Sequence, residues 1–317
     1  MAKFDTYQDV TDAVLANLEA GTRPWKQDWQ GSAVQMPHRV TGDEYRGINV
    51  VLLWMSATAQ GFGGRTWMTF KQAKELGGKV RKGSKGTRIV FFKKIEVKDR
   101  EAAGDDETKR IPMLRTYTVF NSDQIDDLPE KYASPAPIVA AGPSMERDRA
   151  AEEALRSCGA EIVEAGSRAF YTPATDVVTM PDFERFASSS GYLATLAHEL
   201  CHWTGHKTRL DRFGKNDRTS YAFEELVAEL GAAFIGSRLG IVGEHIDNHS
   251  AYLAGWLKVL RDDKRAIFRA ASLAQAAADM VLAQAAPIEE REEAAPVAAK
   301  TPATAAEPAP AAQLALI

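Results

Sequence analysis

The chain has 317 residues, of which 45% are hydrophobic and 26% charged, and its net charge is −4. These values are ordinary for a soluble globular protein. No stretch reaches the roughly 20 apolar residues that a membrane-spanning helix needs, and the N-terminus lacks a signal-peptide core, so no membrane partner is expected. Because the only cysteines are Cys158 and Cys201, we expect reduced thiols and a cytoplasmic protein rather than a disulfide framework.

The N-terminal part of the chain predicts a small α+β domain over residues 1–128. Hydrophobic spacing favours a first helix, and a continuous apolar run (INVVLLWMSA) is either a buried helix or a buried strand. A short helix follows, and two segments rich in β-branched and aromatic residues should pair as strands across an acidic, polar loop. The expected elements are helix 7–18, buried segment 48–57, helix 70–76, strand 88–97, loop 99–110 and strand 115–120.

Basic residues are concentrated in one part of this domain. Residues 64–98 contain eleven Lys and Arg against two acids, and such a stretch is either a solvated face or a surface that meets phosphates. The loop GGKVRKGSKGTR sets cations among four glycines, whose amides can approach phosphates, although it matches no P-loop. A protein that binds single-stranded nucleic acid needs cations that contact the phosphates and flat side chains on which the bases stack. The candidate DNA-binding residues are Trp25, Trp29, Lys79, Arg81, Lys82, Lys85 and Arg88.

The rest of the chain predicts a linker, a second domain and a tail. Residues 129–146 are the expected linker, and residues 147–285 the second domain, mostly helical with a short sheet. The last segment, 286–317, has no periodic apolar face and is expected to be a disordered Ala/Pro-rich tail. The expected elements of the second domain are helix 147–157, strands 161–163 and 168–180, and helices from 192 to about 285 with breaks at 205–220 and 240–247.

The stretch HELCH, residues 198–202, places ligand-type side chains one helical turn apart. His198 and His202 are four residues apart, so in a helix their imidazoles project from one face and can share a tetrahedral ion. Glu199 lies beside them, where a carboxylate can accept a proton from water. The alternative is a pair of buried structural histidines next to a surface glutamate. We expect a metal site with Glu199 as its catalytic residue.

A third ligand has to come from elsewhere, because a catalytic zinc site uses three protein ligands and one open position. His206 is excluded by spacing, since the motif HExxHxxGxxH would require a histidine where Thr208 stands. The pattern EELVAE on the next predicted helix offers Glu225 as the ligand and Glu229 as the acid that supports a metal-binding histidine. These two roles can be exchanged, and Glu224 is expected to point elsewhere.

If the site is catalytic, the expected reaction is hydrolysis of a peptide bond, with Zn²⁺ as the ion and another divalent metal such as Mn²⁺ as the alternative. Glu199 would take a proton from water and pass it to the leaving amine. His249 and Tyr252 are candidates for stabilising the oxyanion, against the plainer interpretations of a helix-start histidine and a core tyrosine. The strand-like segment 168–180 could pair with an extended peptide.

Several segments, in one order along the chain, resemble the ArdC-type antirestriction proteins of conjugative plasmids and related mobile elements. They include TGDEYRGINVVLLW, TWMTFKQAKELGGKVRKGSKGTRIVFFKK, YLATLAHELCHWTGHKTRLDRFG and YAFEELVAELGAAFIG, and the resemblance covers residues 5–285. The family implies an N-terminal single-stranded-DNA-binding domain, a C-terminal zincin-like metallopeptidase domain and a role in protecting incoming plasmid DNA from host restriction. It also implies a metal site at His198, His202 and the EELVAE acids, with Glu199 as acid/base.

The leading hypothesis is therefore an enzyme: a single-stranded-DNA-binding metallopeptidase that acts on a protein or peptide whose identity the sequence does not reveal. The alternative is a binding module in which the metal site is structural or regulatory. A third hypothesis, a primase-accessory protein, rests on the similarity of the N-terminal part to plasmid primase-associated proteins.

Overall fold

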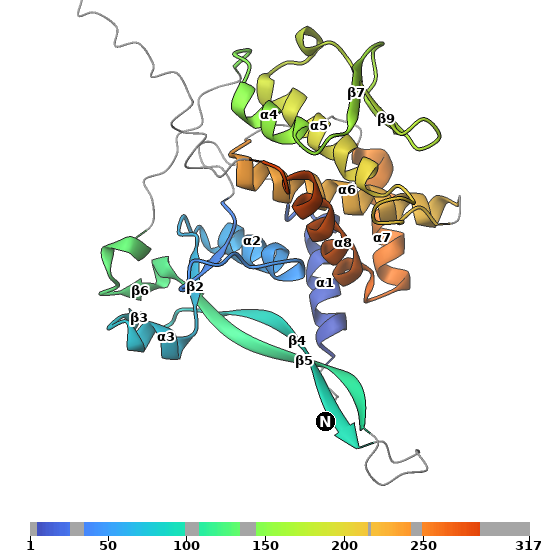
Figure 1. Ribbon diagram of the computed structural model, residues 1–317. Coiled ribbons are helices and arrows are strands. Elements are labelled where there is room, and N and C mark those ends of the chain that lie inside the picture. The colour runs from blue at the N-terminus through green and yellow to red at the C-terminus, as the bar shows by residue number, and fades with distance from the viewer. Residues whose placement is uncertain are drawn as a thin grey trace, which may run out of the picture. The chain divides into compact units, whose positions relative to one another are not determined.

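A computed structural model describes residues 5–25, 35–98, 108–133, 144–214, 217–241 and 249–285, without the side chains of 93–98, 108–113 and 249–251. Met1–Ala285 form one compact unit, and the predicted disordered tail, 286–317, lies outside the described residues. The described part combines helices with short sheets and is mostly helical toward its C-terminal end (Figure 1), which confirms the predicted α+β class. None of its helices is long and apolar enough to cross a membrane.

Two helices open the fold. Helix α1 (Thr6–Glu19) begins after Asp5, whose carboxylate accepts hydrogen bonds from backbone amides of the first turn. Helix α2 (Ile48–Gln60) is the apolar run that the sequence left open between helix and strand. It ends at Gly61, which has a φ of 71°, a left-handed conformation that glycine adopts without steric strain. The predicted first helix is thus confirmed, and the ambiguous segment is a helix.

A four-stranded sheet follows, with the strand order β1-β2-β5-β4. Its strands are β1 (His38–Arg39), β2 (Thr66–Met68), β4 (Thr87–Lys98) and β5 (Thr108–Asn121). Strands β4 and β5 form a long antiparallel ribbon whose register runs on to the pair Lys98 and Thr108. The predicted loop 99–110 is therefore too long, because residues 108–110 keep the register of the ribbon and belong to β5.

Smaller elements complete the N-terminal part. A short helix precedes the glycine-rich loop, and a strand within that loop pairs with a later strand in a second, two-stranded sheet of order β3-β6. Tyr132, inside the predicted linker, is buried in a small cluster with Met68, Ala73 and Ile125, so the linker begins with a packed turn. The elements are α3 (Phe70–Glu75), β3 (Lys79–Val80), η1 (Ser122–Gln124), β6 (Ile125–Asp126) and η2 (Glu130–Tyr132).

The C-terminal part places a three-stranded sheet beside a group of helices (Figure 1). Its elements are α4 (Arg149–Arg156), β7 (Glu161–Glu164), β8 (Phe170–Thr172), β9 (Val177–Met180), η3 (Phe183–Arg185), α5 (Ser189–Thr204), α6 (Arg218–Leu239), α7 (His249–Asp262) and α8 (Ala266–Val281). The predicted strand 168–180 is two strands, and β8 lies at an edge of the order β7-β9-β8. The helical stretch has one break more than predicted, at residues 263–265.

Helix α6 is the centre of the helical group, where it packs against α5, α7 and α8. Its middle is buried on almost every side, and Leu226 and Phe234 have no exposed surface. Burial of each such side chain stabilises the folded state by about 1.5–3 kcal/mol relative to an exposed position. Helices α5 and α6 approach closely at Gly231, where an added Cβ would lie 2.6 Å from the Cys201 sulfur. This close approach holds α5 against α6, the two helices that carry the side chains of the candidate site.

The N-terminal elements pack directly on these helices. The ring centroid of Trp54 in α2 lies 5.6 Å from that of Phe234 in α6. Arg238 of α6 forms ion pairs with Glu44 at 2.7 Å and with Asp279 of α8 at 3.0 Å. Apolar and ionic contacts therefore join the two parts of the compact unit. The division into two domains on either side of a linker stays a prediction.

Candidate metal centre

Helix α5 holds the two HELCH histidines one turn apart on the face that meets α6. Its opposite face is fixed in the core, where Leu196 and Leu200 have no exposed surface. The rings of His198 and His202 are 4.8 Å apart between centroids and nearly perpendicular. Their Nε2 atoms are 3.1 Å apart. Helical spacing thus brings the two imidazoles together as the sequence predicted.

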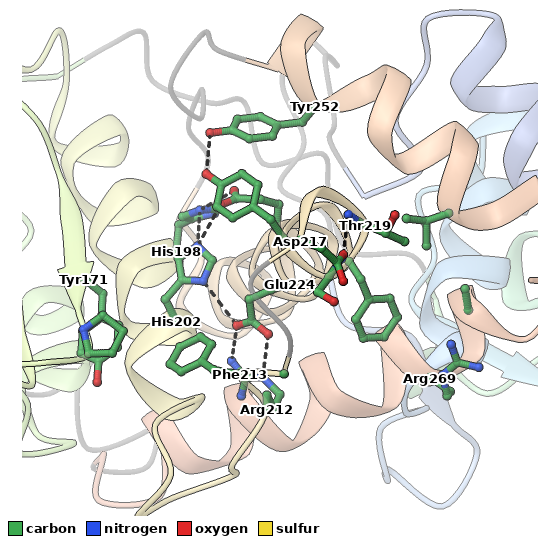
Figure 2. Close-up of a pocket in the computed structure, with 18 of the residues that line it drawn as sticks. Tyr171, His198, His202, Arg212, Phe213, Asp217, Thr219, Glu224, Tyr252 and Arg269 are labelled. Carbon is green, nitrogen blue, oxygen red and sulfur yellow. Dashed lines mark hydrogen bonds and ion pairs between the residues drawn. The ribbon is translucent and has the colours of Figure 1, made fainter. Parts of the chain in front are cut away.

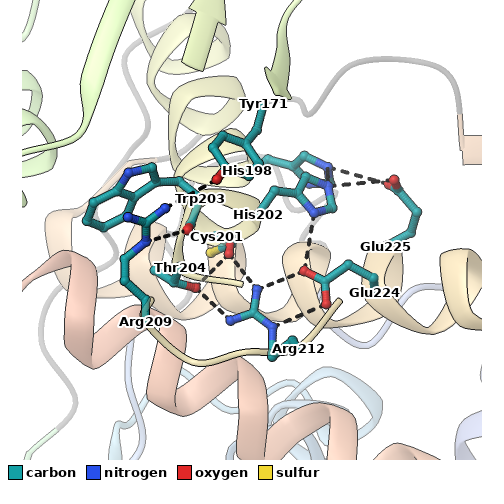
Figure 3. A network of polar contacts seen from close by, with 10 residues as sticks. All are labelled: Tyr171, His198, Cys201, His202, Trp203, Thr204, Arg209, Arg212, Glu224 and Glu225. Atoms are coloured by element: carbon teal, nitrogen blue, oxygen red, sulfur yellow. Dashed lines mark hydrogen bonds and ion pairs between the residues drawn. The ribbon is translucent and has the colours of Figure 1, made fainter. Parts of the chain in front are cut away.

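Helix α6 supplies a carboxylate to the same point, as Figure 3 shows. Glu225 Oε2 lies 3.5 Å from His198 Nε2, and Glu225 Oε1 lies 3.6 Å from His202 Nε2. Ligand atoms of all three side chains lie within 4.8 Å of one another. Within the part of the chain that the structure describes, no other group of His, Cys, Asp and Glu side chains converges in this way.

The donor atoms fit a divalent ion. Metal–nitrogen distances of 2.0–2.1 Å in a tetrahedral site place two donors about 3.3 Å apart, and the three separations here run from 3.1 to 3.6 Å. Burial alone would lower the pKa of His198, but the hydrogen bond with Glu225 and the charges of Glu199 and Glu229 raise it to about 9. The carboxylates around His198 therefore favour positive charge at this point, and a divalent cation supplies such charge.

A second carboxylate, Glu224, supports His202 from behind. Glu224 Oε1 lies 3.3 Å from His202 Nδ1, so a proton on Nδ1 donates to it and leaves the Nε2 lone pair for a metal. Arg212 donates to both oxygens of Glu224, at 2.7 and 3.2 Å. Burial alone would raise the pKa of Glu224, but the hydrogen bonds from His202 and Arg212 hold it below its ordinary value.

Arg212 is itself held by the end of α5. Its Nη2 donates to the Cys201 carbonyl at 2.6 Å and its Nη1 to Thr204 Oγ1 at 2.7 Å, and its side chain is 3% exposed. The chain folds back over the helix end at Gly205, where a Cβ would lie 2.8 Å from the Phe213 ring and 3.0 Å from Arg212 Nη2. Sequence reasoning missed Arg212, because a loop residue carries no periodic signal.

The expectation that Glu224 points away from the site is wrong. Glu229, predicted to support a histidine, is 3% exposed on α6, and its charge raises the pKa of His198. It lies outside the group of ligand atoms that includes Glu225. The structure therefore brings Glu225 to both imidazoles and Glu224 to His202, whereas the ligand and support roles of Glu225 and Glu229 stay predictions.

The imidazoles face a cavity of about 820 Å³ that also reaches Glu199. Figure 2 shows His198 and His202 at its wall, with Tyr171 of β8 on one side and Arg269 of α8 on the other. Glu199 is 7% exposed and follows His198 on α5. A cavity of this size can admit a segment of polypeptide.

Two tyrosines meet at the rim of this cavity. The hydroxyl oxygens of Tyr221 and Tyr252 are 3.2 Å apart, and both residues line the cavity. Burial is the largest cause that raises the pKa of Tyr221, followed by its hydrogen bond with Tyr252. The side chain of His249, the other predicted oxyanion stabiliser, lies outside the described residues. Tyr252 is thus near the site, and Tyr221 is a neighbour that the sequence analysis did not single out.

The turn between β8 and β9 is pinned to the loop after α5. Arg209 Nη1 donates to Asp176 at 3.0 Å, and the Tyr171 hydroxyl donates to the same carboxylate at 2.8 Å. The hydrogen bond from Arg209 is the main cause that lowers the pKa of Asp176 to about 2. These contacts hold the edge strand β8 at the rim of the cavity.

Trp25 cannot act as a stacking surface for bases. Its side chain is 3% exposed, and its ring packs edge-on against Trp256 of α7 with 5.8 Å between centroids. The prediction for Trp25 is therefore wrong, because the ring anchors the chain after α1 on the helical group. Trp29 lies outside the described residues.

The predicted DNA-binding cations are exposed around β3 and the start of β4. Lys79 and Arg81 each form an ion pair with a nearby aspartate, at 2.9 and 3.0 Å. Within the described residues, Lys82 and Lys85 have no carboxylate partner, whereas Arg88 has an interaction partner. Lys82 and Lys85 are thus the cations most available to a ligand, and the DNA-binding role of all five stays a prediction.

Comparison with protein families gives two matches. Residues 4–120 match the N-terminal domain of the anti-restriction factor ArdC. Residues 149–273 match a zincin-like metallopeptidase. The second match spans both helices that carry the candidate metal ligands.

Three related proteins cover most of this chain. The metal-free crystal structure of the antirestriction protein ArdC from plasmid R388 has 48% sequence identity and a TM-score of 0.79, and the match covers 89% of this chain and 98% of that one. The Mn(II)-bound crystal structure of the same protein has 46% identity and a TM-score of 0.76, and the match covers 90% of this chain and 100% of that one. An uncharacterised protein, y4eC of Sinorhizobium fredii, is 39% identical over 88% of this chain and 92% of its own length. The DNA primase TraC of Escherichia coli is 40% identical over 87% of this chain, which spans 20% of that primase.

These matches place the two family domains in one protein of known structure. The ArdC structures are alike in fold over nearly their whole length, and the two family matches lie in the same order as the segments that carried the resemblance. The chain belongs to the ArdC family of antirestriction proteins.

Proposed function

We propose that this chain is a single-stranded-DNA-binding, zinc metallopeptidase-like antirestriction protein that protects plasmid DNA entering a recipient cell by conjugation. The observation that carries the proposal is the convergence of His198, His202 and Glu225 at the wall of a cavity that Glu199 also lines. Membership of the ArdC family supports the antirestriction role. The N-terminal family match supports the DNA partner.

Each residue of the site has a role in this proposal. His198, His202 and Glu225 hold the ion, which is Zn²⁺ by the chemistry of two imidazoles and a carboxylate, with Mn²⁺ as the alternative because a relative was crystallised with Mn(II). When bound, the ion polarises a peptide carbonyl and lowers the pKa of water. Glu199 accepts the proton and passes it to the leaving amine. Tyr252 is the candidate for stabilising the oxyanion.

The residues around the ligands keep this arrangement in place. Glu224 fixes the orientation and tautomer of His202, and Arg212 fixes Glu224. The edge strand β8 lies at the rim of the cavity, where an extended peptide could add to its free edge. The substrate in this proposal is a protein or peptide of the recipient cell, met close to the incoming DNA.

The substitution Glu199→Gln tests whether catalysis matters. It removes the proton acceptor but keeps the size of the side chain, so metal content and single-stranded DNA affinity should stay at wild-type levels. Protection of transferred DNA should fall to the level seen without the protein. The measurement is transfer frequency into restricting and non-restricting recipients, and full protection by the variant would overturn the peptidase function.

One observation favours a second candidate, a binding module without catalysis. A region like this chain forms 20% of the primase TraC, so the same architecture occurs inside a larger DNA-processing protein. In that case the metal would be structural or regulatory, and the protein would serve as a DNA-binding or primase-accessory factor. Glu199→Gln separates the two, since only a peptidase needs that carboxylate.

A further inference from the structure

The β4–β5 ribbon carries an exposed aromatic pair that the fold does not use. Phe91 and Tyr117 are 50% and 44% exposed, and their rings meet edge to face with 6.2 Å between centroids. Among the described residues each ring has the other as its aromatic partner. Large aromatic side chains left in solvent together mark a surface that binds something flat or apolar.

The register places this pair on one face with an arginine. Tyr117 lies opposite Ile89, and Phe91 lies opposite Arg115. Directly paired residues of an antiparallel ladder project to the same side of the sheet, and so do residues two apart on one strand. Phe91 therefore shares one face with Arg115, its partner, and with Tyr117, which is two residues from Arg115. Arg115 is exposed as well. Two rings and a guanidinium are therefore presented together.

Other groups attach the ribbon to the protein. The side-chain amide of Asn49 in α2 donates to the Val90 carbonyl and accepts from the Val90 amide, both at 2.8 Å. Phe92, on the other face, has its ring centroid 6.5 Å from that of Tyr7 and 6.3 Å from that of Phe268. Because these contacts anchor β4, the pair Phe91 and Tyr117 is not needed for attachment.

The charge of the ribbon identifies the kind of partner. The strands Thr87–Lys98 and Thr108–Asn121 contain seven Lys and Arg against one acid, Glu96, in a chain whose net charge is −4. A basic ribbon with exposed rings complements a polyanion that has flat, unpaired groups. Single-stranded DNA has both, whereas the bases of a duplex are already stacked on one another.

We propose that Phe91 and Tyr117 form a stacking platform for the bases of single-stranded DNA, with Arg115 on the same face contacting the backbone phosphates. The proposal rests on the DNA-binding function stated above and gives that function a location. It replaces Trp25, which is buried, as the source of the stacking surface.

The test is fluorescence anisotropy with labelled oligothymidylate and the full chain. Stacking of one base on one ring is worth about 5- to 150-fold in affinity, so Phe91→Ala and Tyr117→Ala should each weaken binding by that factor and the double variant by more. Tyr117→Phe keeps the ring and should bind as wild type does. The melting temperature should fall only slightly in the alanine variants, because each ring is about half exposed and a cross-strand pair contributes about 0.2–1 kcal/mol.

Salt dependence separates stacking from simple charge attraction. Arg115→Ala should reduce the slope of log affinity against log salt by about 0.7, the value for one phosphate contact on a single strand. The alanine variants of Phe91 and Tyr117 should keep the wild-type slope. A reduced slope in the aromatic variants would overturn the stacking assignment.

The outcomes distinguish this inference from the proposed function. A double variant Phe91→Ala/Tyr117→Ala that binds DNA with wild-type affinity would overturn the platform and leave the DNA-binding function in place. If that variant bound DNA normally but lost protection in the transfer assay, the face would be a protein-docking surface instead. Wild-type protein that fails to bind oligothymidylate at low salt would overturn both.

Discussion

The metal pocket and the β4–β5 ribbon expose their functional groups in opposite ways. In the pocket the charged side chains contact one another: Arg212, 3% exposed, donates to Glu224, which pairs with His202. On the ribbon Phe91 and Tyr117 are about half exposed and contact each other. The pocket is therefore part of the protein's core, and the ribbon face is not.

This difference in burial determines how strongly ligand binding is coupled to the stability of the fold in each region. Removing one partner from a buried ionic network leaves the other charge unpaired and costs about 3–5 kcal/mol. An exposed substitution changes stability by less than about 0.5 kcal/mol. Variants in the pocket should therefore change stability and metal affinity together, whereas variants on the ribbon should change ligand affinity with only a small change in stability.

The largest contrast is expected between two aromatic residues of the N-terminal part. Trp25→Ala should destabilise the protein by about 3–5 kcal/mol, because a buried ring leaves a cavity. Phe91→Ala should lower the free energy of unfolding by no more than about 1 kcal/mol, because it removes a half-exposed ring and its cross-strand contact with Tyr117. Chemical denaturation measures both, and equal losses would show that the ribbon face belongs to a core.

Arg212→Met sharpens the comparison within the pocket. It removes the donor that positions Glu224, so metal affinity should fall by about 10- to 100-fold, as for other partners of metal-bound histidines. Isothermal titration with Zn²⁺ at 25 °C measures this in the folded protein. Arg209→Met is the matched control, because Arg209 lies in the same loop but holds Asp176. Equal losses of metal affinity in the two variants would contradict the role of Arg212.

The smallest expected effect is a pH dependence of the stability that Asp176 contributes at the turn between β8 and β9. The folded pKa of Asp176 is about 2, below its ordinary value of 3.8, so its contribution to stability is complete above about pH 5 and is mostly lost as the pH falls to about 2. Asp176→Asn should therefore melt below wild type at pH 6, and the gap should close toward pH 2. A gap that stays constant with pH would exclude the carboxylate as its source.

The metal ligands could be predicted because helix geometry alone determines their spacing. His198 and His202 face the same side of any helix that contains them, and the acids of α6 recur one turn apart. Glu224 was misjudged because adjacent residues diverge by about 100° around a helix. An imidazole carries nitrogens on two edges, so His202 meets Glu225 with one and Glu224 with the other.

The N-terminal part shows the limit of composition as a guide. Trp25 and Phe91 are both aromatic residues near basic ones, but tertiary packing buries the first and exposes the second. The pairing of β4 with β5 was predicted from β-branched and aromatic runs, whereas the register that puts Arg115 opposite Phe91 depends on where the turn falls. Arg212 had no local signal because its position depends on the path of a loop.

The central claim is that Glu225 joins His198 and His202 around one divalent ion. It is tested most directly by metal analysis of wild type, Glu225→Ala and Glu229→Ala after stripping and reloading with Zn²⁺. We expect about one ion per chain in wild type and Glu229→Ala and none retained by Glu225→Ala, since a catalytic zinc site needs three protein ligands. Full occupancy in Glu225→Ala would contradict the account.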